Sequence, residues 1–419
     1  MKPNGRGSAL SLCFVSQQRF EETLGGVQTS VWRMMSWFRK KRIDYYLVFP
    51  KLRGLLGELS SSEIVEMITS PKMATSLDRL PQTEIAYCLW AIAASLKIVS
   101  ANRKRRFSVV HAFGYRFDGL AALIASRIIR TPYSVHIKGP GIHLKDLLPS
   151  KTQRFLRRLE YPLNLLVLRK ADLVLCESEE GRHSLYVHIG KSIKIQLSPP
   201  PIQTKEYKLP VEIRQEMRRK FCERSDTVLI GYVGRLDRGK NVGGLIRAYN
   251  SARKYLASSK LVIVGTGPLD LELRRLARNL GIESEVILLG RRYDVPALLQ
   301  AIDIFVIPSF FEGYSNALLE AMAAGKAIVA SDIPGNREIL GSDWGFFFNP
   351  TDLHALERLL VELGGNLGLR TACGVRANRL AGKYDLDTVC DDFLQKLSSV
   401  VIKSEAITSE VSSQICGLK

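Results

Sequence analysis

The stretch IPSFFEGYSNALLEAMAAGK, residues 307–326, is the most informative segment of this sequence. An apolar run of strand type precedes it at residues 303–307, and a loop opened by Pro308 follows. Ser315 or Asn316 then offers an N-cap for a helix, whose apolar face carries Ala317, Leu318, Ala321 and Met322. A strand, a tight glycine loop and a helix N-terminus favour phosphate binding, because free backbone N–H groups and the helix dipole point at the ligand.

Two glutamates flank this predicted helix N-terminus. Glu312 lies in the loop, and Glu320 lies about one turn inside the helix with its side chain leaning back toward the N-terminus. Carboxylates at these two places can accept hydrogen bonds from sugar hydroxyls while the helix end holds a diphosphate. An ordinary amphipathic helix with one exposed and one capping glutamate is the structural alternative.

A glutamate, seven residues, a second glutamate and then AMAAG resembles the signature of the retaining glycosyltransferases of family 4, which have the GT-B fold. The resemblance extends over residues 10–400, with its motifs concentrated in 231–338. It implies that Glu312 meets the transferred sugar and that Glu320 binds the ribose of the nucleotide. The loop between them would complete the donor site, with Gly313, Tyr314, Ser315 and Asn316.

The segment GYVGRLDRGKN, residues 231–241, opens the second half of the chain. By the same resemblance, Gly234, Arg235 and Lys240 would hold the donor diphosphate. A guanidinium fork and a mobile ammonium suit two phosphates that gain charge as they leave. The spacing from Gly234 to Lys240 also imitates a P-loop, but Asn241 stands where that motif needs a serine or threonine. A basic surface turn is the remaining alternative.

Further glycines and a histidine complete the candidate site. Gly265 and Gly267 follow a predicted strand and resemble the family's turn around the base and ribose. Gly25 and Gly26 lie in the first strand-to-helix loop, where a Cβ would block the approach of backbone N–H groups to a ligand. His136, at the end of a strand, matches the family's histidine at the reaction centre and would assist catalysis. The lesser candidates are His111, Lys138 and a packing motif at Gly335–Glu338.

Composition and charge bound the class of protein. The chain has 419 residues, of which 46% are hydrophobic and 24% charged, and this is typical of soluble globular proteins with two domains. Its seven cysteines include no CxxC pair, so they indicate thiols in a reducing compartment, not a disulfide framework or a zinc site. Residues 1–200 carry 31 Lys+Arg and 15 Asp+Glu, hence +16, and residues 201–419 carry 29 and 26, hence +3. The basic half predicts an anionic partner.

Apolar runs that alternate with helical patterns predict an α/β protein with two doubly wound, Rossmann-like parallel-sheet domains, which in the GT-B fold face a central cleft. The three prolines at 199–201 indicate a stiff linker. We therefore expect an N-terminal acceptor-side domain at 1–200 and a C-terminal nucleotide-sugar-binding domain at 204–385. A crossing helix at about 386–401 would return to the first domain, and 404–419 would form a loose tail.

The sequence thus predicts a retaining glycosyltransferase that moves a sugar from a nucleoside diphosphate sugar to a hydroxyl of a glycan or lipid-linked acceptor, in cell-surface polysaccharide or glycolipid synthesis. A GT-B sugar-nucleotide epimerase or phosphorylase and a basic nucleic-acid-binding protein are the alternatives, the last weakened by the lack of aromatics among the basic runs. We expect no cofactor and no metal, because the Asp385-Leu386-Asp387 motif is better suited to capping the last helix. No spanning segment or signal peptide is evident, so we expect a cytoplasmic enzyme, peripheral on an anionic membrane.

Overall fold

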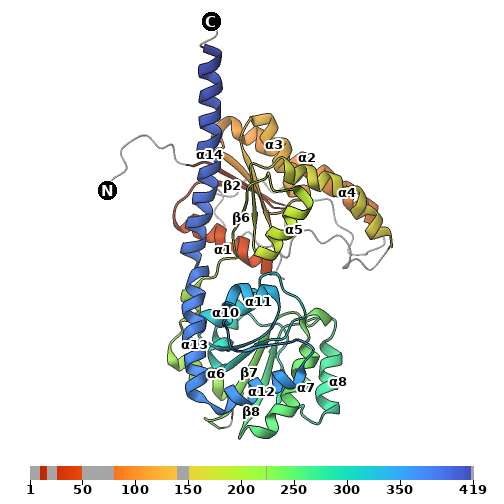
Figure 1. Cartoon of the computed structure of the whole chain (residues 1–419), viewed down its shortest axis with the longest axis vertical. Coiled ribbons are helices and arrows are strands. Elements are labelled where there is room, and N and C mark those ends of the chain that lie inside the picture. Colours follow the sequence, from red (N-terminus) through yellow and green to blue (C-terminus); the bar gives the residue numbers. More distant parts are fainter. Residues whose placement is uncertain (1–9, 17–25, 50–79, 139–150, 223, 417–419) are drawn as a thin grey trace, which may run out of the picture. The chain divides into compact units, whose positions relative to one another are not determined.

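The computed structural model describes residues 10–16, 26–49, 80–138, 151–222 and 224–416 (Figure 1). The chain forms two compact units, one of Met1–Pro199 with Cys390–Lys419 and the other of Pro200–Val389. The boundary falls within the run of prolines at 199–201. In the described part of the chain, no helix has both the length and the apolar character needed to cross a membrane.

The first unit contains a parallel sheet of six strands in the order β2-β1-β3-β4-β5-β6. The strands are β1 (Leu12–Val15), β2 (Tyr45–Val48), β3 (Val109–Ala112), β4 (Tyr133–Ile137), β5 (Leu173–Cys176) and β6 (Ile195–Leu197). Its helices are α1 (Gly26–Lys40), α2 (Leu80–Arg105), α3 (Phe117–Ile129), α4 (Lys151–Arg169) and α5 (Glu179–Ile189). The central strands are buried along their length, which explains why they read as continuous apolar runs.

The second unit contains another six-stranded parallel sheet, in the order β12-β11-β10-β7-β8-β9. The strands are β7 (Val228–Val233), β8 (Ser259–Val264), β9 (Val286–Leu288), β10 (Ile304–Ile307), β11 (Ala327–Ser331) and β12 (Phe347–Phe348). The strand order reverses between β7 and β10, which pair directly. In sheets of this kind, ligands bind beyond the carboxyl ends of the strands at such a reversal.

Helices flank the second sheet, as Figure 1 shows. They are α6 (Val211–Arg219), α7 (Val242–Ala252), α8 (Asp270–Asn279), α9 (Val295–Ala301), α10 (Asn316–Ala323), α11 (Pro334–Leu340), α12 (Leu353–Gly365) and α13 (Leu367–Ala381). Short 3-10 turns occur at Thr204–Tyr207, Arg238–Lys240, Arg253–Tyr255 and Gly382–Tyr384. With the first sheet, this arrangement confirms the predicted fold class of two doubly wound parallel-sheet domains.

The last helix, α14 (Leu386–Cys416), belongs to both units. Its start is tied to the second unit by the Leu386 N–H, which donates to the Ile202 carbonyl over 2.9 Å. Within the first unit, the Phe393 ring lies 4.9 Å from that of His111 and 6.3 Å from that of His136. The prediction of a loose tail at 404–419 is wrong as far as Cys416, because no proline or glycine interrupts the helix before Gly417.

Candidate functional site: the carboxyl edge of the second sheet

Two adjacent strands place the strongest sequence candidates at the strand-order reversal of the second sheet. The turn that contains Gly234, Arg235 and Lys240 follows β7, and the loop that contains Glu312 follows β10. The Phe310 N–H donates to the Gly239 carbonyl over 2.9 Å and so holds the two loops together. Because carboxyl ends of neighbouring parallel strands meet at one edge, residues 72 positions apart become neighbours.

An ion pair between Lys240 and Glu312 lies at the centre of this edge. The Lys240 Nζ is 2.6 Å from the Glu312 Oε1, with side-chain exposures of 24% and 10%. The Ser309 hydroxyl donates to the same oxygen over 2.7 Å. Partial burial strengthens such a pair relative to a surface pair. The sequence singled out both charged residues but not their pairing, nor the part played by Ser309.

Arg235 and Asp237 form a second ion pair in the same turn. The Arg235 Nη2 lies 2.5 Å from the Asp237 Oδ2, and the arginine side chain is 81% exposed. The Arg235 carbonyl accepts from the Tyr232 hydroxyl over 2.9 Å, which fixes the backbone of the turn. The guanidinium therefore projects into solvent from a rigid base, where it can reach a ligand phosphate.

The N-terminus of α10 lies directly after the Glu312 loop. Ser315 is the N-cap, and its hydroxyl accepts from the Leu318 N–H over 3.3 Å, so Asn316 is the first residue of the helix. Gly313 and Tyr314 connect the cap to Glu312, and the Tyr314 hydroxyl donates to that of Tyr384 over 3.2 Å. Glu320 lies in the second turn with its side chain half-buried. A capped helix N-terminus beside two cations favours an anionic ligand.

The glycine turn after β8 packs against the turn after β7. Gly265 has φ of +136°, and a Cβ at this position would lie 1.8 Å from the Gly234 carbonyl oxygen. A Cβ at Gly267 would lie 2.3 Å from the Leu236 carbonyl oxygen. Only glycine fits both places, because the backbones of the two turns approach each other directly. The two glycines thus allow the turn after β8 to pack directly against the turn that carries Arg235 and Lys240.

A buried polar network supports the Glu312 loop from below. The Ser331 hydroxyl donates to the Ser309 carbonyl over 2.6 Å, and the Asn336 side-chain amide donates to the Ser331 carbonyl over 2.9 Å. A Cβ at Gly335 would lie 2.5 Å from the carbonyl oxygens of Glu312 and Gly313. This close packing confirms that the motif at Gly335–Glu338 has a structural role, as expected.

The candidates of the first unit lie deeper than the sequence suggests. His136 is fully buried in β4, and its Nε2 donates to the Ser198 carbonyl over 3.1 Å, which leaves Nδ1 as the acceptor nitrogen. His111 is also fully buried, with Nδ1 2.8 Å from the Ser134 hydroxyl. The Lys138 ammonium lies 3.2 Å from the Glu177 carboxylate, and both side chains are buried. Gly26 is the first residue of α1, and Gly25 lies outside the described residues.

Both histidines are neutral in this environment. Burial lowers the pKa of His111 to about 3, and the Lys138 charge lowers it further in the same direction. Burial, followed by the Lys138 charge, also holds the pKa of His136 well below its ordinary value. An imidazole of this kind can donate or accept a hydrogen bond but does not carry a positive charge near neutral pH.

The described residues contain no group of three or more His, Cys, Asp or Glu side chains that could hold a metal ion. Asp385 acts as the cap of α14 that the sequence predicts, because its Oδ1 accepts from the Asp387 N–H over 3.1 Å and Oδ2 accepts from the Thr204 hydroxyl. One carboxylate that serves both contacts is committed to the fold.

The fold and the site together define a class: a two-unit α/β protein with two paired cations and a capped helix N-terminus at a strand-order reversal. The chain matches the family described as Glycosyl transferases group 1 over residues 213–379, and the one described as Glycosyltransferase Family 4 over residues 24–206. The chain belongs to this family of group 1 glycosyltransferases and has the GT-B fold.

Two relatives illustrate the membership, and one solved structure illustrates the fold. An N-acetylgalactosamine-N,N'-diacetylbacillosaminyl-diphospho-undecaprenol 4-alpha-N-acetylgalactosaminyltransferase of Campylobacter jejuni is 30% identical over 61% of this chain and 66% of its own length. The putative glycosyltransferase EpsD of Bacillus subtilis is 32% identical over 61% of this chain and 67% of its own. HepE of Anabaena in complex with UDP is 19% identical, with a TM-score of 0.72, over 93% of this chain and 100% of that one. Sequence similarity thus spans about two thirds of the relatives' lengths.

Proposed function

We propose that this chain transfers a sugar from a nucleoside diphosphate sugar to a hydroxyl of a glycan or lipid-linked acceptor, with retention of anomeric configuration. The observation that carries the proposal is the Lys240–Glu312 pair beside the capped N-terminus of α10. Membership of the family favours this activity over the epimerase, phosphorylase and nucleic-acid-binding alternatives. Retention rests on the resemblance of the two-glutamate motif to the family signature.

The donor diphosphate would lie between the N-terminus of α10 and the cations that follow β7. Arg235 and Lys240 would stabilise the charge that develops on the leaving diphosphate, since a preorganised cation costs no reorganisation during the reaction. Glu320, on the same helix, would accept hydrogen bonds from the ribose. HepE, which shares the fold, has been solved with UDP and with UDP-glucose, which supports a uridine nucleotide as the first donor to test.

The ion pair suggests how Glu312 would be released for its role. In the structure, the carboxylate of Glu312 neutralises the Lys240 ammonium and accepts from Ser309. A diphosphate carries more charge than one carboxylate and would attract Lys240 toward itself. Glu312 could then accept from hydroxyls of the sugar and orient it, while Ser309 keeps the carboxylate in place. His136, neutral and buried, remains a predicted assistant to the reaction and not a proton donor with a formal charge.

The acceptor is proposed from chemistry and from relatives. The name of the Campylobacter jejuni relative specifies a glycan on diphospho-undecaprenol, which is a lipid-linked acceptor. The basic runs at 39–42 and 103–106 end α1 and α2, and Arg105 pairs with Asp44 over 3.0 Å, so the two runs lie side by side. We propose that this basic face contacts an anionic membrane on the cytoplasmic side, in polysaccharide or glycolipid synthesis.

We also propose that catalysis needs neither metal nor cofactor. Arg235 and Lys240 would supply the positive charge that a divalent cation provides in other transferases. Activity of the purified protein should therefore persist in a chelator.

The test is a thermal-shift screen of the full chain against a panel of nucleotide sugars, followed by transfer to an undecaprenyl-diphosphate-linked sugar. A bound donor should raise the melting temperature by mass action. The anomeric configuration of the product, read by NMR, then tests retention. No shift with any nucleotide sugar would contradict the proposed donor, and an inverted product would contradict the proposed stereochemistry.

A further inference from the structure

A cationic cavity lies at the edge of the second sheet opposite the candidate donor site, at the amino ends of β10 and β11. Its volume is about 420 Å³, and its walls come from α6, α13 and the turns that precede the two strands. This volume falls in the range of small-molecule sites. Asp303 and Lys326 line it, whereas Glu312 and the donor-site loops follow the same strands at the other end, so the two sites are separate.

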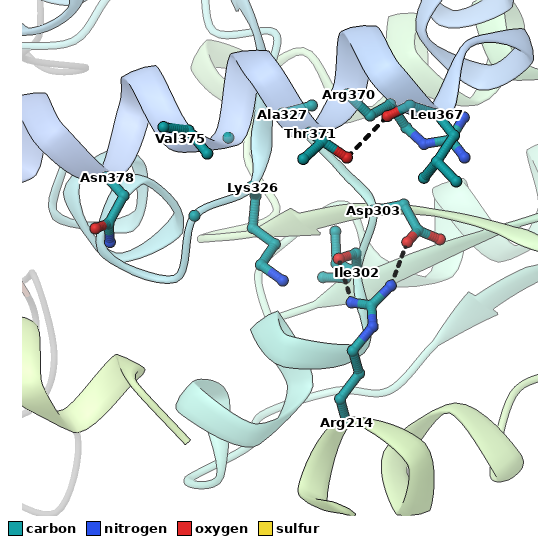
Figure 2. Close-up of a pocket in the computed structure, with 12 residues that line it drawn as sticks. Arg214, Ile302, Asp303, Lys326, Ala327, Leu367, Arg370, Thr371, Val375 and Asn378 are labelled. Atoms are coloured by element: carbon teal, nitrogen blue, oxygen red, sulfur yellow. Dashed lines mark hydrogen bonds and ion pairs between the residues drawn. The ribbon is translucent and has the colours of Figure 1, made fainter. Parts of the chain in front are cut away.

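Lys326 is the buried cation of this cavity. The residue is only 6% exposed, and within the described residues the one hydrogen bond of its side chain runs from Nζ to the Gln300 carbonyl over 3.2 Å. Figure 2 shows the side chain extending from the start of β11 toward Arg214 and Asp303, beneath α13. An ammonium has three protons to donate, so two donors of Lys326 remain for a ligand.

The other charges of the cavity leave it positive. Asp303 is committed to two arginines, 2.6 Å from the Arg214 Nη2 and 2.7 Å from the Arg218 Nη1. Arg370 on α13 donates to the carbonyls of Leu363 and Gly364, each over 2.6 Å. These two carbonyl oxygens orient the Arg370 guanidinium group but do not neutralise its charge. When Lys326 is protonated, three cations and one carboxylate line the cavity, which leaves an excess of two positive charges.

We propose that this cavity is a binding site for a small phosphate monoester. A monoester carries a charge of about −1.5 to −2 at neutral pH, which matches the excess. The phosphate would accept from Lys326, and the organic body would lie against Thr371 and Val375 on α13, which hang over the cavity in Figure 2. The inference does not depend on the proposed transferase activity, because no residue of the donor site takes part.

The protonation of Lys326 should respond to the ligand. Burial lowers the pKa of Lys326 to about 7, with a further lowering by Arg214 and Arg218 and an opposing effect of Asp303. Arg370 on α13 is the remaining charged group that lines the cavity. An anion stabilises the ammonium, so binding near pH 8 should take up a proton, and affinity should fall as pH rises.

The test is isothermal titration of glycerol 3-phosphate into the full chain, with variants of Lys326 and Val375 to show where the ester binds. Neutral glycerol and acetate serve as ligand controls. We expect glycerol 3-phosphate to bind, with proton uptake seen by comparing buffers of different ionisation enthalpy. Lys326→Met should weaken binding at least about tenfold, because it removes the buried charge. Wild-type affinity weaker than about 10 mM, or equal binding of acetate, would overturn the proposal.

A pair of variants at Val375 separates ligand binding from folding. Val375 is 67% exposed, so substitution there does not disturb the core. Val375→Glu places a carboxylate in the wall of the cavity and should weaken binding of glycerol 3-phosphate several-fold by repulsion. Val375→Gln introduces a side chain of the same size as glutamate but without its charge, and this variant should bind glycerol 3-phosphate as the wild type does. If the two variants bind equally, the cavity is not the binding site.

Discussion

Among single residues, we predict different roles for the two glutamates of the site: Glu320 binds the nucleotide, and Glu312, which pairs with Lys240, contributes to turnover. Glu320→Ala should weaken UDP binding about tenfold or more, because a lost hydrogen bond to a charged group costs about 1.5–3 kcal/mol. Glu312→Gln keeps a side chain that can contact Ser309 and should mainly lower kcat. Titration of UDP and steady-state kinetics measure the two effects, with the exposed Glu362→Ala as control. Unchanged UDP binding in Glu320→Ala would show that this role is wrong.

Lys326 gives a pH prediction in buffer free of phosphate esters. Its pKa is lowered to about 7 in the fold but is near its ordinary 10.5 in the unfolded chain, so between these values the unfolded chain binds the extra proton. The free energy of unfolding of the wild type, relative to Lys326→Met, should therefore rise with pH, by at most about 1.4 kcal/mol per unit. Urea unfolding at several pH values checks this, and the exposed Lys383→Met should track the wild type. A pH-independent difference between wild type and Lys326→Met would contradict the prediction.

Residue types in sequence patterns predicted local roles better than long-range ones. Ser315 and Asp385 are N-caps as predicted, because capping depends on neighbours within three residues. The Lys240–Glu312 pair joins residues 72 positions apart, and no local pattern announces it. Lys326 is the last residue of the stretch 307–326, but the sequence did not predict its burial or its place in a cavity. The cavity around it is formed by α6 and α13, which are distant in the sequence.

At the scale of elements, the two glycine turns are the rigid part of the donor site. Gly265→Ala forces a Cβ against the Gly234 carbonyl at a φ of +136° and should destabilise the fold by at least about 2 kcal/mol. Gly365→Ala is the matched control, since Gly365 ends α12 with nothing within 4 Å of an added Cβ. Thermal unfolding should show a lower melting temperature for the first variant and an equal or higher one for the second. Equal melting temperatures would contradict the packing argument.

Strands were predicted more completely than helices. Buried strands such as β7 and β10 consist of short apolar runs that the sequence makes plain. The helix α2 was not predicted, because its exposed side carries Leu89, Ile92 and Leu96 and the helix therefore lacks a clear amphipathic pattern.

At the scale of the whole molecule, the charge asymmetry predicts association with anionic membranes. The chain should float with anionic liposomes and not with neutral ones, because each Lys or Arg near an anionic surface contributes about 1 kcal/mol. High salt should strip it from the liposomes, since the Debye length is about 8 Å at physiological ionic strength. Binding to neither kind of liposome, with activity on a soluble acceptor intact, would leave the basic face to a phosphorylated acceptor.

Two triple variants sharpen the flotation experiment. Replacement of the exposed Arg103, Lys104 and Arg106 by glutamine removes three charges from the basic face. Replacement of the exposed Arg275, Arg278 and Arg291 removes the same number from the second unit. Only the first set should reduce flotation. Equal loss in both would indicate a response to net charge alone, not a docking face.

The architecture of the whole molecule was largely predictable, because two rounds of strand–helix alternation surround the prolines at 199–201. The strand order of each sheet was not, since register and order depend on contacts between distant segments. The order matters for function, because the reversal between β7 and β10 is what brings the two candidate loops together.

Turnover of the donor that the nucleotide-sugar screen identifies shows whether the donor reacts at the carboxyl edge of the second sheet. We predict that Arg235→Ala and Lys240→Ala each lower kcat at least about tenfold, because each removes charge complementary to the leaving diphosphate. Arg235 is 81% exposed, so Arg235→Ala should keep a melting temperature close to that of the wild type. Lys254→Ala, an exposed cation of the same unit, should leave kcat unchanged. Wild-type turnover in Arg235→Ala and Lys240→Ala would contradict the account, because the carboxyl edge of the second sheet would then not be where the donor reacts.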